Sequence, residues 1–384
     1  MNFDLSDDQG AFAEAAQQFS NQELLPMAAE WDQKSIFPKD VLKAAGDMGF
    51  MSLYTPESSG GMGLSRLDAS IIFEQLSMGC TSTTAFMTIH NMVTWMIASF
   101  GTEEAKSQYC PQLVTGEHLG SYCLTEANAG SDAAALATTA TKQDDGYVLN
   151  GAKAFISGAG DTDVLVVMAR TGEAGAKGIS AFVVDAHADG ISYGRKEPKM
   201  GWHSQPTRSV TFDKVKIPAS ALLGKEGEGF IFAMKGLDGG RINIASCSIG
   251  TAQQALNQAK QYMSERKQFG RSLSQFQGLQ FKLADMATEL IAARQLVRYA
   301  AFKLDQADPE ATAYCAMAKR YATDVGFKVC DQALQIFGGY GYIQEYPLER
   351  YCRDARVHQI LEGTNEIMRL IIARRVLSDG VDLL

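Results

Sequence analysis

The stretch LADMATELIAARQLVRYAAFKL, residues 283–304, carries an apolar residue at every third or fourth position. This spacing follows the turn of an α-helix and puts the apolar side chains on one face. One apolar stripe of this length, with polar residues around the rest of the helix, is typical of a helix packed in a bundle. The stripe consists of Leu283, Met286, Leu290, Ala293, Val297, Ala300 and Leu304.

Helical patterns continue on both sides of this stretch, so residues 225–384 are predicted to form a C-terminal four-helix bundle domain. Residues 312–337 form a second apolar stripe. It ends at Gly338 and Gly339, and a glycine there is typical of a helix C-terminus.

Residues 1–119 are predicted to form an N-terminal helical domain. Ser6 is a plausible N-cap of its first helix. Pro38 lies near the start of a later helix and Gly49 near its end. A glycine-rich loop follows over residues 56–68, and helical patterns then resume.

Residues 120–224 differ, because short runs of β-branched and apolar residues alternate there with turn signals. Asp144-Asp145-Gly146 predicts a hairpin turn. No amphipathic helix of useful length fits between the runs, so we expect a central antiparallel, barrel-like β domain. The strand candidates are YVLNG (147–151), DVLVVMAR (163–170), GISAFVVD (178–185) and TRSVTFDKVKIP (207–218).

Composition excludes several classes of function. The formal net charge of -9 disfavours binding to a nucleic-acid backbone, and no apolar run reaches the length of a membrane span. The N-terminal stretch MNFDLSDDQGAF lacks the features of a secretory signal or transit peptide, which favours a cytoplasmic protein. The seven scattered cysteines indicate reduced thiols, and the histidines lack the spacing of a metal site.

Sequence motifs narrow the choice further. No GxGxxG follows a strand, which argues against a Rossmann nucleotide site, and no GxSxG or P-loop is present. In SYCLTEANAGSDAAA (121–135), small residues alternate with hydroxyl groups just after a strand. This pattern fits either an Asx-type turn or a loop that lets a planar ligand or its phosphates approach the backbone.

Two further stretches are open to two interpretations. SERKQFG (264–270) is either a solvated, charged helix end or a site where an arginine binds pyrophosphate beside an aromatic ring. In ILEGTNEIMR (360–369), Glu362 lies between an apolar run and a glycine. It is either an exposed turn residue or a base whose pKa is tuned by an apolar pocket.

Taken together, the chain resembles the acyl-CoA dehydrogenase family over nearly all of its length. CLTEANAGSD (123–132) and QIFGGYGYIQEYPLERYCRD (335–354) resemble the two signatures of the family, and ERKQFG (265–270) and EGTNE (362–366) occur at the corresponding intervals. The resemblance implies an N-terminal helical domain, a central β-barrel-like domain and a C-terminal four-helix bundle, assembled as a homotetramer.

The resemblance also implies a role for individual residues. Glu362 matches the base that removes the α-proton of an acyl-CoA thioester while a hydride passes to N5 of FAD. The residues that match FAD contacts are Tyr122, Cys123, Leu124, Thr125, Gly130, Ser131, Phe155, Ile156, Ser157, Arg266, Phe269, Gln277, Gln335, Gly338, Gly339, Thr364 and Glu366. The residues that match contacts to the CoA substrate are Ser131, Asp238, Arg241 and Arg374.

Within the family, GCTSTTAFMTIHNM (79–92) and RVHQILEGTNEIMR (356–369) are most similar to members that act on short branched acyl-CoA thioesters. The implied reaction converts isobutyryl-CoA to methacrylyl-CoA, a step of valine catabolism, with an electron-transferring flavoprotein as acceptor. Preference for 2-methylbutyryl-CoA or butyryl-CoA is the alternative. An oxidase or a non-catalytic member of the fold fits less well, because oxidases are longer chains and Glu362 is intact.

One position departs from the family pattern, and another bears on which residue is the base. Ala127-Asn128 stands where the family usually has Pro-Gly, which bears on the rigidity of the flavin loop because proline fixes φ. Some relatives place the base at the position of Gly240, where this chain has no side chain. The resemblance therefore leaves Glu362 without a competitor.

Overall fold

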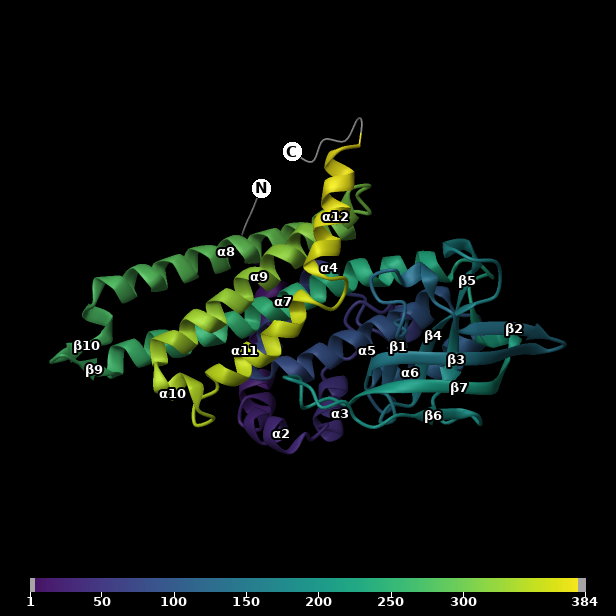
Figure 1. Ribbon diagram of the computed structural model, residues 1–384, viewed down its shortest axis with the longest axis horizontal. Helices are drawn as coiled ribbons and strands as arrows, with labels where there is room; N and C mark the ends of the chain where they lie inside the picture. The colour runs from purple at the N-terminus through teal and green to yellow at the C-terminus, as the bar shows by residue number, and fades with distance from the viewer. Residues whose placement is uncertain (1–3, 379–384) are drawn as a thin grey trace.

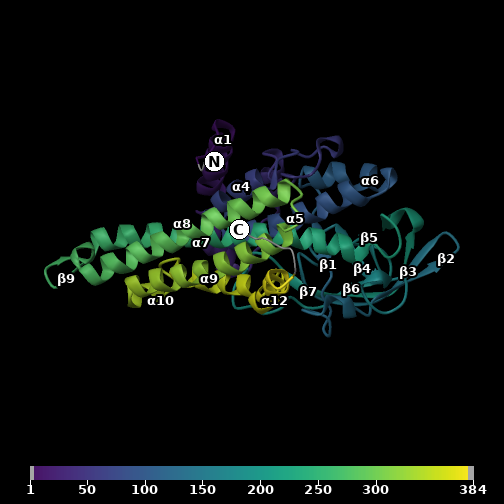
Figure 2. The ribbon, with the colours of Figure 1, turned by 90° about the horizontal axis from the view of Figure 1, so that it is seen from above.

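The computed structural model describes residues 4–378. Helices, then a sheet, then helices follow one another along the chain, as predicted. Figure 1 shows the sheet at one end of the molecule and the long C-terminal helices extending away from it. Figure 2 shows that the N-terminal helices cover one side of this arrangement.

The N-terminal helices are α1 (Asp7–Phe19), α2 (Ala28–Lys34), α3 (Lys39–Asp47), α4 (Arg66–Gly79), α5 (Thr81–Phe100) and α6 (Glu103–Val114). Ser6 caps α1 as predicted: its Oγ accepts a hydrogen bond from the amide of Gln9, and the Gln9 side chain accepts one from the amide of Ser6. α5 is apolar around most of its circumference, and nearly all of its side chains are buried. It therefore packs on other elements on all sides, between the other helices and the sheet.

The central strands are β1 (Gly120–Cys123), β2 (Thr139–Gln143), β3 (Gly146–Ser157), β4 (Val164–Arg170), β5 (Ile179–Asp185), β6 (Ile191–Tyr193), β7 (Thr207–Pro218) and β8 (Leu222–Leu223). Their order across the sheet is β6-β7-β3-β2-β4-β5-β8, with β1 beside β4. The β2–β3 hairpin turns at Asp144 and Asp145, as predicted. The candidate strands at 163–170, 178–185 and 207–218 correspond to β4, β5 and β7.

Most strand pairs are antiparallel, as expected. β1 and β4, however, are parallel, and β2 also pairs in parallel with β4, through a single pair of residues. A parallel pair requires a long connection. The segment between β1 and β4 contains the whole β2–β3 hairpin, which lets β4 run in the same direction as β1. The strands β6 and β8 were not predicted, because two or three residues carry too little alternation to be recognised.

The C-terminal helices are α7 (Gly229–Glu265), α8 (Gln277–Asp305), α9 (Ala311–Phe337), α10 (Gly339–Tyr342), α11 (Leu348–Arg356) and α12 (Asn365–Val376). A small hairpin of β9 (Lys267–Gln268) and β10 (Arg271–Ser272) joins α7 to α8. The three long helices α7, α8 and α9 pack on one another, α4 packs on α7 and α8, and the short α11 packs on α9 and α7 (Figure 1).

The apolar stripe of residues 283–304 faces this bundle, as predicted. Met286, Leu290, Ala293, Val297 and Ala300 are buried in the core that α7, α8 and α9 share. Leu283 and Leu304, at the two ends of the stripe, are half-buried against that core. Within residues 4–378, no helix is both long and apolar enough to cross a membrane.

Candidate active site

Glu362 lies in the short connection between α11 and α12. Its backbone is left-handed, with φ of 56°, and Gly363 follows with φ of 88°. Thr364 then caps α12, because its Oγ1 accepts a hydrogen bond from the amide of Ile367 at 3.3 Å. Left-handed backbone is uncommon for a residue with a side chain and is often retained at functional sites. The turn aims the Glu362 side chain back at α7.

The Glu362 carboxylate rests on Gly240 of α7. A Cβ atom at position 240 would lie closer than 3.0 Å to Glu362 Oε2. Glycine at 240 is therefore what makes room for the carboxylate. Among the described residues, Oε2 has no hydrogen-bond partner, although it is buried. A second acidic side chain at 240 would occupy the same space as the carboxylate of Glu362.

Burial raises the pKa of Glu362 to about 7, while the positive charges of Arg241 and Lys319 act in the opposite direction. Arg241 donates from Nε to the carbonyl oxygen of Glu362 at 3.4 Å. Lys319, which is fully buried in α9, donates from Nζ to the carbonyl oxygen of Gly363 at 2.7 Å and to Asn365 Oδ1 at 2.9 Å. The two cations thus hold the backbone of the left-handed turn from both sides.

The charge of Glu362 also acts on Tyr122, which lies near the end of β1. Burial raises its pKa well above the usual value, and the charge of Glu362 raises it further. Its hydroxyl group is buried and has no hydrogen-bond partner within residues 4–378. Buried hydroxyl groups in native proteins almost always have a hydrogen-bond partner. Tyr122 and Glu362 therefore leave two polar atoms open to a ligand.

The loop after β1 is held by a buried ion pair. Lys153 Nζ contacts Glu126 Oε1 at 2.7 Å and the carbonyl oxygen of Leu124 at 3.1 Å. The other acceptor positions of Glu126 are filled by the amides of Ala137 and Thr138. This network fixes the two ends of the loop although it carries no proline. These side-chain contacts restrain the loop next to Ala127-Asn128, where the family usually has Pro-Gly.

Along this loop, Cys123 and Leu124 are buried and contribute to the core, whereas Thr125 is half-buried and Gly130 and Ser131 are exposed. The amide of Ala154 donates to the carbonyl oxygen of Thr125 at 2.9 Å, which brings β3 beside the loop.

On β3, a β-bulge turns one side chain outward. The register of β3 with β7 shifts between Lys153 and Ile156, and Phe155 has φ of 59°. Phe155 is 69% exposed, whereas Ile156 is buried and the carbonyl oxygen of Ser157 accepts from Ser121. An exposed phenylalanine held by strained backbone is a suitable platform for a flat ring system.

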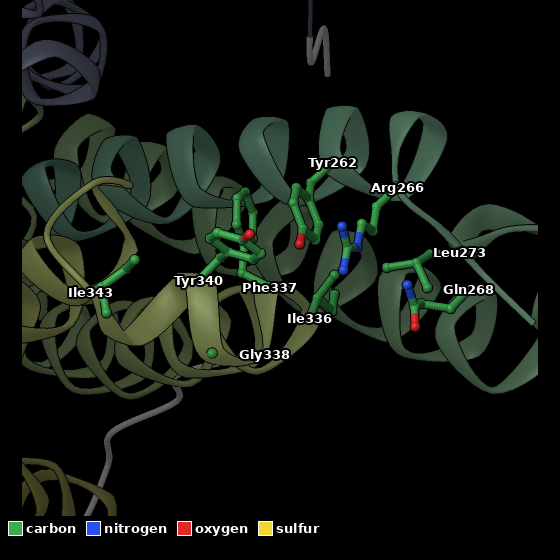
Figure 3. Close-up of a pocket in the computed structure, with 10 residues that line it drawn as sticks. Tyr262, Arg266, Gln268, Leu273, Ile336, Phe337, Gly338, Tyr340 and Ile343 are labelled. Carbon is green, nitrogen blue, oxygen red and sulfur yellow. The ribbon is translucent and has the colours of Figure 1, made fainter.

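A second group of predicted residues meets at the far end of the bundle. A cavity of about 540 Å³ opens between the end of α7 and the α9–α10 junction. Figure 3 shows Arg266, just after α7, and Tyr340, on α10, directed toward the same space. Arg266, Gly338 and Gly339 all line this cavity. At both glycines, the position that a Cβ atom would occupy has no other atom within 4 Å. A cationic, glycine-lined cavity suits a phosphate group.

Not every residue predicted for this second group lines the cavity. Phe269 is 94% exposed beside it, Gln277 begins α8, and Gln335 is in the last turn of α9. The sequence interpretation missed Tyr262 and Phe337, whose rings stack at 4.0 Å and form one wall. Aromatic residues at these helical positions could have been noticed but are common in cores.

The two groups lie far apart within one chain. Arg266, the residue that follows the end of α7, is 26 positions beyond Gly240, which corresponds to roughly 39 Å along the helix axis. A single dinucleotide is shorter than this, so it would not reach from Gly240, beside Glu362, to the cavity at Arg266 within one chain.

The residues predicted to contact the CoA substrate are placed in different surroundings. Asp238 and Arg241 are buried and paired with each other at 2.6 Å, and Thr312 donates to the second oxygen of Asp238. Ser131 and Arg374 are exposed, on the loop after β1 and on α12. Glu366, predicted as a flavin contact, is exposed and pairs with Arg369.

Sequence reasoning did not find Lys319, Glu126 or Lys153. The available signal was a lysine within the apolar stripe of α9, where a charged side chain is rarely buried without a partner.

Comparison with known proteins gives a consistent picture. Profiles of the N-terminal, middle and C-terminal domains of acyl-CoA dehydrogenases match residues 6–117, 121–215 and 227–377. The mitochondrial isobutyryl-CoA dehydrogenase of Bos taurus is 52% identical over 98% of this chain and 90% of its own. The solved butyryl-CoA dehydrogenase of Megasphaera elsdenii has a TM-score of 0.95 and 41% identity, covering 98% of this chain and 100% of that one. A chain from a structure titled as the electron transferring flavoprotein of Acidaminococcus fermentans has a TM-score of 0.96 and 43% identity, covering 99% and 100%.

Proposed function

The chain belongs to the acyl-CoA dehydrogenase family, whose members are FAD-dependent enzymes, and from this premise we propose that it converts isobutyryl-CoA to methacrylyl-CoA with Glu362 as the base. The observation that carries the proposal is the desolvated carboxylate of Glu362. It lies on Gly240 with one oxygen free of hydrogen bonds, and its pKa is about 7.

A base with this pKa suits the removal of a weakly acidic α-proton near neutral pH. Because Oε2 makes no hydrogen bond with the described residues, it is available to accept the proton. The left-handed turn keeps the carboxylate on α7 instead of in solvent. FAD, when bound, supplies the hydride acceptor that no protein side chain can provide.

Removal of the α-proton places negative charge on the thioester oxygen, which requires a donor. The amide N–H of Glu362 makes no hydrogen bond within residues 4–378. A free backbone amide beside the base is a suitable donor for that oxygen. The base and one oxyanion donor would then come from the same residue.

The open polar and exposed groups of the chain fit FAD in two separate places. The first comprises Gly130, Ser131, Phe155 and Ser157, beside the loop after β1, and suits the flavin ring. The second is the glycine-lined cavity at Arg266, which suits the pyrophosphate and adenosine portion. Since Arg266 lies roughly 39 Å along α7 from Gly240, which is beside the proposed base, the proposal includes a homotetramer in which one subunit completes the cofactor site of another.

The proposed acyl group of the substrate is inferred from the similarity of this chain to its relatives. The 52% identity to an isobutyryl-CoA dehydrogenase favours a short branched acyl group, and with it a role in valine catabolism. The 41% identity to a butyryl-CoA dehydrogenase keeps butyryl-CoA as the alternative, together with 2-methylbutyryl-CoA. One methylene group changes selectivity by only about 1–3 kcal/mol, so related substrates are expected to react more slowly instead of being excluded.

An electron-transferring flavoprotein is the proposed electron acceptor. The high similarity to a chain solved in work on such a flavoprotein supports this choice. We propose that it docks near the loop that carries Met62 and Leu64, where Met62 is 43% exposed. A cytoplasmic location stays a prediction, since the relative from Bos taurus is mitochondrial.

The experiment that tests the function is an anaerobic titration of the purified protein, followed by the visible absorbance of the flavin. The proposal predicts a yellow protein whose absorbance bleaches at a lower concentration of isobutyryl-CoA than of 2-methylbutyryl-CoA or butyryl-CoA. Bleaching at a lower concentration of butyryl-CoA would show that butyryl-CoA is the preferred substrate, while the assignment to the family would stand. Rapid production of hydrogen peroxide in air would instead indicate an oxidase.

A further inference from the structure

Arg66, at the start of α4, is a buried cation whose guanidinium group forms no ion pair within residues 4–378. Its side chain lies in the interior, with the whole residue 9% exposed, and Nη1 is fully buried without a hydrogen-bond partner. Its backbone amide donates to Asp305 Oδ1 at 2.7 Å, and burial raises the pKa of that carboxyl group while the charge of Arg66 lowers it. Buried arginines are almost always paired, so this one requires an explanation.

Two aromatic rings hold the guanidinium group in place. Its Cζ lies 3.4 Å from the centre of the Tyr54 ring and 4.9 Å from that of Trp95. Stacking on ring faces stabilises a cation that has few other partners. Gly239 of α7 lies on the third side, where a Cβ would be closer than 3.0 Å to Nη1. The guanidinium group therefore fills a slot between α4, α5 and α7.

This slot lies next to the proposed base. Gly239 faces Arg66 and the adjacent Gly240 faces the Glu362 carboxylate. Since neighbouring side-chain positions on a helix are about 5 Å apart, Nη1 of Arg66 and Oε2 of Glu362 are within roughly 10 Å of each other. Tyr54 faces the same stretch of α7, because its hydroxyl accepts a hydrogen bond from Asn243 at 3.1 Å.

One turn before Gly240, apolar side chains pack on the same helix. A Cβ at Gly236, one turn before Gly240, would contact the side chains of Met92 and Met96 at 3.3 and 3.5 Å. An alkyl group fits such surroundings. It would fit poorly against Arg66, because it would cover the remaining surface of a cation without offering it an acceptor.

We propose that the Arg66 side chain closes the distal end of the acyl pocket and so restricts the enzyme to short acyl chains. This inference rests on the proposed function and names the residue that sets chain length in the same site. A short acyl group ends before it reaches the guanidinium group. A longer straight chain must displace Arg66 from Tyr54 and Trp95 or leave the cation covered.

The test compares the wild-type holoenzyme with Arg66→Met, using isobutyryl-CoA and hexanoyl-CoA. Methionine keeps an unbranched apolar stem but removes the guanidinium group. We expect the ratio of kcat/KM for hexanoyl-CoA to that for isobutyryl-CoA to rise at least about tenfold, the discrimination typical of one methylene group. The same change should appear in the affinity for hexanoyl-CoA, measured from the flavin spectrum in a Glu362→Gln background, where oxidation is slow enough for binding to be measured first.

Arg298→Met is the matched control. Arg298 is another poorly partnered arginine, on α8, with an unpaired Nε and a long contact of 3.9 Å to Glu74. Its replacement should leave the ratio unchanged. An equal rise in Arg298→Met would contradict a local role of Arg66, and so would a folded Arg66→Met enzyme with an unchanged ratio.

Gly239→Ala provides a second variant in case Arg66→Met does not fold. Its added methyl group would push the guanidinium group away from α7 and into the pocket. The ratio of kcat/KM for propionyl-CoA to that for isobutyryl-CoA should then rise several-fold, and an unchanged ratio would overturn the inference. If the wild-type protein oxidises none of these thioesters, the proposed function and this inference fail together. If it oxidises isobutyryl-CoA but the variants keep its chain-length preference, only the inference fails.

Discussion

Replacing Lys319 with methionine should move the pH dependence of the enzyme toward higher pH. Lys319 is fully buried, and its positive charge lowers the pKa of Glu362, which burial alone would raise further. Methionine has a similar length but no charge. The base is active when ionised, so a higher pKa of Glu362 reduces the active fraction at neutral pH.

The size of the effect follows from the charges. A nearby opposite charge lowers the pKa of a carboxyl group by about 1–3 units. At the lower limit, loss of Lys319 raises the pKa of Glu362 from about 7 to roughly 8. The ionised fraction at pH 7 then falls from about one half to about one tenth, a roughly fivefold loss of rate.

The effect should be confined to the lower part of the pH range. Burial lowers the pKa of Lys319 itself to about 8. Above that pH the wild-type lysine is increasingly neutral and no longer assists ionisation of Glu362. The two proteins should therefore differ most below pH 8 and converge above about pH 9.

Overall stability should change less than activity. A pKa of about 8 means that burial disfavours the ammonium group by about 3 kcal/mol, a penalty that methionine removes. Against this, the variant leaves the carbonyl oxygen of Gly363 and Asn365 Oδ1 without their donor, at about 1–3 kcal/mol each. These opposed contributions leave a net loss of about 3 kcal/mol or less, so a folded variant is expected.

The assay is the pH profile of kcat/KM for isobutyryl-CoA between pH 5.5 and 10, because this parameter reports ionisations of the free enzyme. Lys328→Met is the control, since Lys328 forms an exposed ion pair with Glu289 away from the base. A profile of Lys319→Met that coincides with the wild-type profile would refute the electrostatic argument. A loss of equal size at every pH would also refute it, and would assign Lys319 a purely geometric role.

Two other substitutions test the surroundings of the site. Gly240→Ala places a Cβ against Glu362 Oε2, so kcat should fall at least about tenfold while the flavin spectrum of the unliganded enzyme stays unchanged; normal turnover would show that the carboxylate does not rest on α7. Glu126→Gln leaves the ammonium group of Lys153 buried without its carboxylate, so the free energy of unfolding should fall by about 3–5 kcal/mol. In chemical denaturation, the double variant Glu126→Gln/Lys153→Met should recover part of that loss, and an additive loss would contradict a direct interaction.

The order of helices and strands could be predicted because each region has a distinct period. The stripe of residues 283–304 repeats with the helical turn, and the runs in β4 and β5 are continuous and β-branched. The parallel pairing of β1 with β4 could not be predicted, because pairing direction depends on how distant segments meet. Helix boundaries were predictable where a cap or a glycine marked them, as at Ser6 and Gly338.

The candidate site was predictable in part. Glu362 stands out in the sequence only through the resemblance to a family, since a glutamate before a glycine is ordinarily an exposed turn residue. Its left-handed backbone, the space provided by Gly240 and the buried Lys319 depend on α7, α9 and the α11–α12 connection meeting in three dimensions. Arg66 gave no sequence signal, because burial of an arginine depends on the rings that stack on it.

The most direct test of the central claim is the rate of anaerobic flavin bleaching by isobutyryl-CoA in the Glu362→Gln variant. Glutamine keeps the shape of the side chain but cannot accept the α-proton as a carboxylate does. Proton transfer by a positioned base contributes about 10²–10⁴-fold to a rate, so we expect bleaching to slow by about a thousandfold while the flavin remains bound. Bleaching within tenfold of the wild-type rate would contradict the assignment of Glu362 as the base.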